Sequence, residues 1–144
     1  MADFRKVGLA IIRDGRILLC RKKNGLPHLI LPGGKPELGE SSIDCLQREI
    51  REELGPVTIA RLKYFGTYTS AAAVAPGEPP RVVEIELYLG QITGEAKASG
   101  EIAELVWFGA SDDPTQLAPS LANFILPDLR KVTDLYYEAE GSSS

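Results

Sequence analysis

Three glutamates in the middle of the chain, Glu49, Glu52 and Glu53, have the spacing expected of a site for a divalent cation. Carboxylate oxygens are ligands that Mg²⁺ accepts, and the ion retains waters and binds phosphates as well. On a helix, separations of three and four residues place the three carboxylates on one arc. The competing interpretation is a solvated helix face, in which these glutamates pair with Arg48 and Arg51.

A glycine loop precedes the acidic segment and strengthens the interpretation as a site. Gly33 and Gly34 follow Pro32, and glycine lets a backbone approach a ligand with no side chain in the way. Lys35 follows directly and is a candidate for binding phosphate. Cys45 is predicted to project toward the same acidic arc, as a small packing residue, because a hard cation prefers oxygen.

A helix from Ser41 to Leu54 must carry the glutamates. Ser41 or Ser42 can cap its start, and Gly55 followed by Pro56 is typical of a helix end. The predicted buried stripe borders the acidic arc and consists of Ile43, Leu46, Ile50 and Leu54. The carboxylates are therefore expected at the edge of the protein body, where a pocket can form.

Alternating and β-branched segments on both sides of this helix predict a sheet. Asp14-Gly15 is a two-residue hairpin signal. A terminal helix is predicted over residues 119–138, with Pro127 expected to kink or split it. The order indicates an α+β fold with helices packed on a mixed sheet, one domain over residues 1–140 and a solvated tail at 141–144. The predicted strands are residues 4–12, 17–20, 28–31, 57–69, 81–92 and part of 101–108.

Composition excludes several classes of protein. The 144 residues are 44% hydrophobic and 25% charged, as in globular domains, and the net charge of −4 argues against a binder of nucleic-acid backbones. No apolar run is long enough to span a membrane, and the first residues do not form a secretory signal. Cys20 and Cys45 read as reduced thiols, so a cytoplasmic protein is expected. The single histidine, His28, rules out a site built on several imidazoles and is expected to be structural.

The central stretch resembles the Nudix box, a 23-residue signature that here runs from Gly34 to Pro56. The matching pattern is Gly34, five residues, Glu40, seven residues, then Arg48-Glu49-Ile50-x-Glu52-Glu53-x-Gly55, and every fixed charged and glycine position is filled. Two positions depart from the pattern. Pro56 stands where the last box residue is usually aliphatic, and Leu29 stands where an aromatic residue often precedes the Pro-Gly-Gly.

The resemblance implies a Nudix fold, an α/β/α sandwich with a mixed sheet between helices. It also implies hydrolysis of a nucleoside diphosphate linked to another group X, with Mg²⁺ or Mn²⁺ and attack of water on phosphorus. Arg48 would orient the glutamates, while Gly34 and Glu40 would support the junction of loop and helix. The implied metal ligands are the carboxylates of Glu49, Glu52 and Glu53 and the backbone carbonyl of Gly33.

The resemblance leaves the general base and the group X open. Glu101 is the first candidate for the base, with Glu84, Glu86 or a box glutamate as alternatives. Candidates for binding the phosphates of a small nucleotide-type substrate are Arg21, Lys22, Lys23 and Lys35. The number of metal ions and the oligomeric state also stay open, and a homodimer is one alternative.

Two other functions compete with hydrolysis. Isomerases of Nudix fold act on isoprenyl diphosphates, but they need a reactive cysteine, whereas Cys45 lies inside the predicted helix. Regulators of Nudix fold that sense a nucleotide without cleaving it often lose box glutamates, which this chain keeps. The sequence therefore favours the pyrophosphohydrolase.

Overall fold

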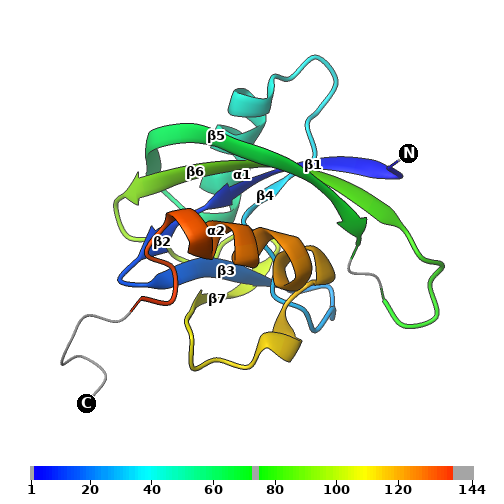
Figure 1. The fold of residues 1–144 in the computed structure, drawn as a ribbon. Coiled ribbons are helices and arrows are strands. Elements are labelled where there is room, and N and C mark those ends of the chain that lie inside the picture. Colours follow the sequence, from blue (N-terminus) through cyan, green and yellow to red (C-terminus); the bar gives the residue numbers. More distant parts are fainter. Residues whose placement is uncertain (1, 73–74, 138–144) are drawn as a thin grey trace.

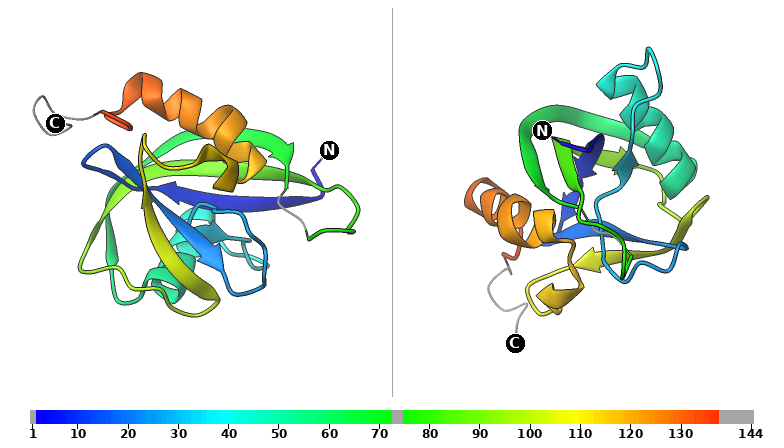
Figure 2. Two further views of the ribbon diagram at one scale, coloured as in Figure 1. Left: turned by 90° about the horizontal axis from the view of Figure 1, so that it is seen from below. Right: turned by 90° about the vertical axis from the view of Figure 1, so that its right-hand side faces the viewer.

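The computed structural model describes residues 2–72 and 75–137, in which strands form a layer with a helix on each side (Figures 1 and 2). This confirms the predicted α+β class. The elements in chain order are β1 (Phe4–Ala10), β2 (Ile12–Arg13), β3 (Arg16–Lys22), β4 (Gly33–Gly34), α1 (Ser42–Leu54), β5 (Thr58–Ala71), β6 (Val82–Thr93), β7 (Ile102–Phe108), the 3₁₀ turn η1 (Pro114–Gln116), the π-helical turn η2 (Leu121–Ile125) and α2 (Leu126–Val132).

The strand layer is split into two sheets. The first has the order β4-β1-β6-β5, and it is mixed because β1 is parallel to β6 and antiparallel to β4. The second, β2-β3-β7, is antiparallel. β2 and β3 form the predicted hairpin, in which Asp14 and Gly15 have φ of 54° and 77°, as a turn with two positive-φ residues requires.

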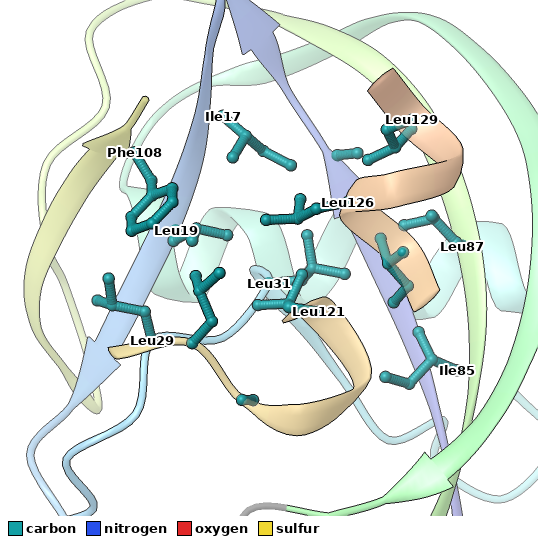
Figure 3. Packing of buried hydrophobic residues seen from close by; sticks show 14 of the residues in the cluster. Ile17, Leu19, Leu29, Leu31, Ile85, Leu87, Phe108, Leu121, Leu126 and Leu129 are labelled. Atoms are coloured by element: carbon teal, nitrogen blue, oxygen red, sulfur yellow. The ribbon is translucent and has the colours of Figure 1, made fainter. Parts of the chain in front are cut away.

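Two hydrophobic clusters fill the spaces between the strands and the helices. Leu9 and Leu18 belong to the cluster under α1, whereas their neighbours Ala10 and Leu19 belong to the cluster under α2. Successive strand residues point to opposite faces, so β1 and β3 are buried on both sides. Figure 3 shows the second cluster, where Leu126 of α2 packs toward residues of β3 and β7.

Residues 28–34 differ from the prediction. Leu29 and Ile30 form only isolated bridges, because the Leu29 amide donates to Gln116 and the Ile30 amide to Cys20. Successive amides thus bond to different segments and no continuous ladder forms. Gly33 and Gly34, expected in a loop, instead form the short strand β4 against Val7 and Gly8.

The terminal helix is shorter than predicted and ends at Val132. Pro127 does not split it; the turn before it is π-helical, with the Leu126 amide bonded to the carbonyl of Leu121, and the chain then continues as α2. Glu138 and the predicted tail at 141–144 lie outside the described residues. Within residues 2–72 and 75–137, no helix has the length and apolar character needed to cross a membrane.

Candidate active site

Helix α1 begins and ends as its sequence predicts, but its buried face is rotated. Ser41 Oγ accepts a hydrogen bond from the Asp44 amide at 3.1 Å, and the Gly55 amide closes the last turn. Ile43, predicted to be buried, is 37% exposed, while Cys45 and Glu53 are buried. The strand layer therefore contacts the side of the helix nearer to the acidic residues, and one glutamate becomes part of the core.

Glu53 is the buried glutamate, with only 6% of its surface exposed. Its Oε1 accepts a hydrogen bond from the Gly33 amide at 2.7 Å. Burial raises the pKa of Glu53 to about 7, the hydrogen bond from Gly33 opposes that rise, and the negative charge of Glu49 adds to it. The carboxyl group thus sits between strand β4 and helix α1, where a cation would relieve its repulsion with Glu49.

Gly33 and Gly34 are glycines for different reasons. At Gly33, φ is +140° and a Cβ would lie 2.0 Å from the Val7 carbonyl oxygen, so backbone conformation and strand pairing both require glycine. At Gly34, a Cβ would lie 2.4 Å from Cδ of Glu49. The second glycine therefore makes room for the Glu49 carboxylate.

Arg48 joins the loop to the helix. Its Nε and Nη2 each donate to a different oxygen of Glu40 at 2.8 Å, and Nη1 donates to Glu49 Oε1 at 2.9 Å. Nη2 also reaches the carbonyl of Lys35 at 3.3 Å. The hydrogen bonds from Arg48 and then from the Glu37 amide lower the pKa of Glu40 to about 2. This geometry suits the orienting role expected of Arg48 and the supporting role expected of Glu40.

Glu52 lies apart from the other two glutamates. Its side chain is 59% exposed, and Oε2 lies 3.5 Å from Nη1 of Arg48. In the described part of the chain, no three Asp, Glu, His or Cys side chains converge closely enough to form a metal site. The three carboxylates thus do not meet at one point in the described residues, and ligation of a cation by all three stays a prediction. The chemistry still fits a hard cation, because Glu49 and Glu53 present oxygen donors to the same cleft.

The cleft has a volume of about 560 Å³ and is lined by both of these glutamates. Glu101, in the turn before β7, also lines the cleft, and its role as the base stays a prediction. Lys22 and Lys35 also line it. Phe4 is a further lining residue, with Nζ of Lys35 4.5 Å from its ring centroid. The cleft thus combines Glu49 and Glu53 with two further acids, Glu78 and Glu101, and several basic side chains.

Four of the predicted candidates outside the box do not line this cleft. Glu84 and Glu86 point to the opposite face of β6 from Val83 and Ile85, which do line it. Glu86 instead accepts hydrogen bonds from Arg5 and Tyr88. The other two are Arg21 and Lys23.

Arg21 is occupied in holding the surrounding loops. It pairs with Glu104 and donates to the carbonyl of Pro27 and to the side chain of Gln116 at 3.1 Å. The register shifts between Arg21 and Lys22, where β3 pairs with β7. Lys22, one residue later, is the member of the basic run 21–23 that lines the cleft.

Lys6 is a cleft residue that the sequence interpretation missed. It lies on β1, between Arg5 and Val7, and lines the cleft with Glu49 and Glu53. One feature of the sequence could have identified Lys6. It directly precedes four residues that the structure shows to be buried, Val7, Gly8, Leu9 and Ala10. A lysine at the edge of a strand buried on both faces points into the interior or a pocket, because successive side chains alternate.

Comparisons with known proteins agree with this geometry. A family model, the NUDIX domain, matches residues 3–126. An ADP-ribose pyrophosphatase of Methanocaldococcus jannaschii is 35% identical over 109 residues, 72% of this chain and 60% of the relative. An NAD-capped RNA hydrolase, NudC of Vibrio cholerae, is 29% identical over 110 residues, 74% of this chain and 37% of the relative. The chain thus spans less than two thirds of these relatives.

Solved structures show the same similarity. A MutT NUDIX hydrolase from Burkholderia pseudomallei superposes with a TM-score of 0.65 at 30% identity, covering 90% of this chain and 98% of that one. The E. coli ORF135 protein superposes with a TM-score of 0.60 at 27% identity, covering 88% of this chain and 89% of that one.

Proposed function

Because the chain belongs to the NUDIX domain family, we propose that it is a pyrophosphohydrolase that cleaves a nucleoside diphosphate linked to another group X, with Mg²⁺ or Mn²⁺ as cofactor. The observation that carries this proposal is the position of Glu49 and Glu53, whose carboxylates are held against Gly34 and Gly33 in a cleft that also contains basic side chains. The relatives named for hydrolysis of ADP-ribose and NAD-capped RNA support the same class of reaction.

Glu49 and Glu53 would hold the cation, with the Gly33 carbonyl and Glu52 as the further ligands that the box pattern implies. When bound, a divalent cation neutralises pyrophosphate charge and lowers the pKa of a bound water. Arg48 keeps the Glu49 carboxylate in place through the 2.9 Å hydrogen bond and anchors the loop through Glu40. Burial of Glu53 fixes its carboxyl group before any ligand arrives.

Glu101 is the proposed acceptor of the proton from the attacking water. It lines the cleft, and its backbone carbonyl accepts a hydrogen bond from the Lys23 amide at 2.8 Å, which ties its turn to the end of β3. The rival acids Glu84 and Glu86 do not line the cleft. A positioned base of this kind contributes a factor of about 10² to 10⁴ to the rate.

The decisive experiment is hydrolysis of a broad panel of nucleotides, nucleotide sugars and dinucleotides with Mg²⁺ or Mn²⁺. The wild-type protein is expected to release phosphate-containing products from at least one of them. Glu53→Gln should lose that activity yet stay folded, because its amide oxygen can still accept the hydrogen bond from Gly33. Glu84→Gln, outside the cleft, is the matched control and should retain activity. No hydrolysis of any compound by the wild type would favour a nucleotide sensor.

A further inference from the structure

Lys6 is a cleft residue whose positive charge has no acidic partner among the residues that the structure describes. The residue is half-buried and lines the cleft beside Glu49 and Glu53. In the part of the chain that the structure describes, Lys6 is in no salt bridge and its ammonium donates no side-chain hydrogen bond; Glu53 is bonded instead to the Gly33 amide. The Lys6 side chain is thus available to a ligand in the cleft.

The surroundings of Lys6 are costly for a cation in the absence of a ligand. Burial, followed by the positive charge of Lys22, lowers the pKa of Lys6 to about 8, while Glu53 and Glu49 only partly compensate. Lysine is seldom buried without a partner. An anion in the cleft would supply the missing partner.

We propose that Lys6 of β1 and Lys22 of β3 together bind phosphate oxygens of the substrate, and that Lys6 is a substrate-binding residue of this chain. The two lysines come from different sheets and line one cleft with the carboxylates that would hold the cation. A diphosphate carries several anionic oxygens, so it can contact a cation on one side and two ammonium groups on the other. This inference rests on the proposed function for the identity of the substrate.

The alternative is a structural role, in which the aliphatic stem of Lys6 only packs against the cleft wall while its ammonium group reaches water. Lys6→Met separates the two roles, because methionine keeps an unbranched apolar stem and removes the charge. Lys6→Arg keeps the charge. Lys23→Met is the matched control, since Lys23 directly follows Lys22 in the sequence but does not line the cleft.

The experiment is a calorimetric titration of the full chain with methylenediphosphonate, a diphosphate mimic that cannot be hydrolysed, in the presence of Mg²⁺. Loss of one charge-assisted hydrogen bond should weaken binding to Lys6→Met about tenfold or more. Lys6→Arg is expected to bind within about threefold of wild type, and Lys23→Met should bind as wild type does. Melting curves without ligand check the fold, and Lys6→Met should be at least as stable as wild type because it removes a poorly solvated charge.

Undiminished binding by Lys6→Met would overturn the inference, as would a wild-type protein that does not bind the mimic. The two proposals fail in different ways. A chain that hydrolyses its substrate but binds the mimic independently of Lys6 refutes the role of Lys6 alone. A chain that cleaves nothing yet needs Lys6 to bind the mimic refutes the hydrolase and leaves the phosphate site standing.

Discussion

Substitution by alanine is expected to act differently at the two adjacent glycines of β4, reducing mainly activity at Gly34 and mainly stability at Gly33. In Gly34→Ala, the new Cβ would lie 2.4 Å from Cδ of Glu49, so the carboxyl group must move by about 1 Å to reach ordinary contact at 3.4 Å. In Gly33→Ala, the new Cβ would meet the Val7 carbonyl oxygen at 2.0 Å and Gly8 Cα at 2.9 Å, both in the backbone of β1. Only the first clash can be relieved by moving a side chain.

The loss of folding stability in each variant depends on whether a side chain or the backbone must move. Gly34→Ala costs about 0.5–1.5 kcal/mol for an off-rotamer Glu49, and up to about 1 kcal/mol for its pairing with Arg48. Alanine offsets part of this by restricting the unfolded chain, by about 0.4–1 kcal/mol. Gly33→Ala costs about 1–3 kcal/mol for the strained backbone, and about 1–3 kcal/mol more if Glu53 loses its hydrogen bond inside the protein.

The assay compares urea unfolding with kcat/KM on the substrate found in the panel. Gly34→Ala should lose no more than about 2 kcal/mol of stability, yet lose about 10²-fold in activity, because displacement of a site group by 1 Å has an effect of that size. Gly33→Ala should lose about 2–6 kcal/mol of stability, the sum of its two costs. Equal destabilisation by the two variants, or full activity in Gly34→Ala, would refute this account of the site.

Three further predictions concern titration and reactivity. The pKa of Glu40 in the folded protein, about 2, lies below the ordinary value of about 4.3. Glu40 therefore contributes stability above about pH 4.3, and this contribution is lost as the pH falls toward 2. Urea midpoints measured from pH 6 to pH 3 should fall less in Glu40→Gln than in wild type. Burial raises the pKa of Cys45 to about 11 and that of Cys20 further, so a thiol reagent at pH 8 should react slowly with the native protein and rapidly with two thiols after unfolding; fast reaction of the native protein would contradict this. Glu101→Gln should lower kcat by about 10² to 10⁴ with little effect on stability, and an unchanged kcat would return the role of base to a box glutamate.

The parts of the site that the sequence predicted are those determined by local spacing. The cap at Ser41, the end at Gly55 and the bond between Arg48 and Glu49 all lie within or beside one helix, where separation along the chain fixes position. Cys20 and Cys45 are free thiols, as predicted, and Cys45 is buried as a packing residue. Here the sequence pattern and the structure agree.

The sequence predictions were wrong or incomplete where the position of a side chain depends on contacts with segments distant in the sequence. Ile43 and Glu53 exchanged roles because the strand layer, rather than the periodicity of the helix, decides which side is covered. Lys22 instead of Arg21 or Lys23 reaches the cleft because of the irregular pairing of β3 with β7. Lys6 lies 43 residues before Glu49 in the printed sequence, and only the pairing of β1 with β4 brings its strand to the site. A motif of fixed spacing cannot predict such a pairing between distant strands.

The bonds of Arg48 make the loop before α1 and the Glu49 carboxylate thermodynamically linked. One guanidinium group holds Glu40 and the carbonyl of Lys35 on one side and Glu49 on the other. A ligand that restricts Glu49 therefore also restricts the backbone of the loop, and by reciprocity an ordered loop favours the ligand by the same factor. Leu38 is fully exposed in that loop. Ordering of the loop that contains it and binding of substrate beside Glu49 are therefore parts of one coupled equilibrium.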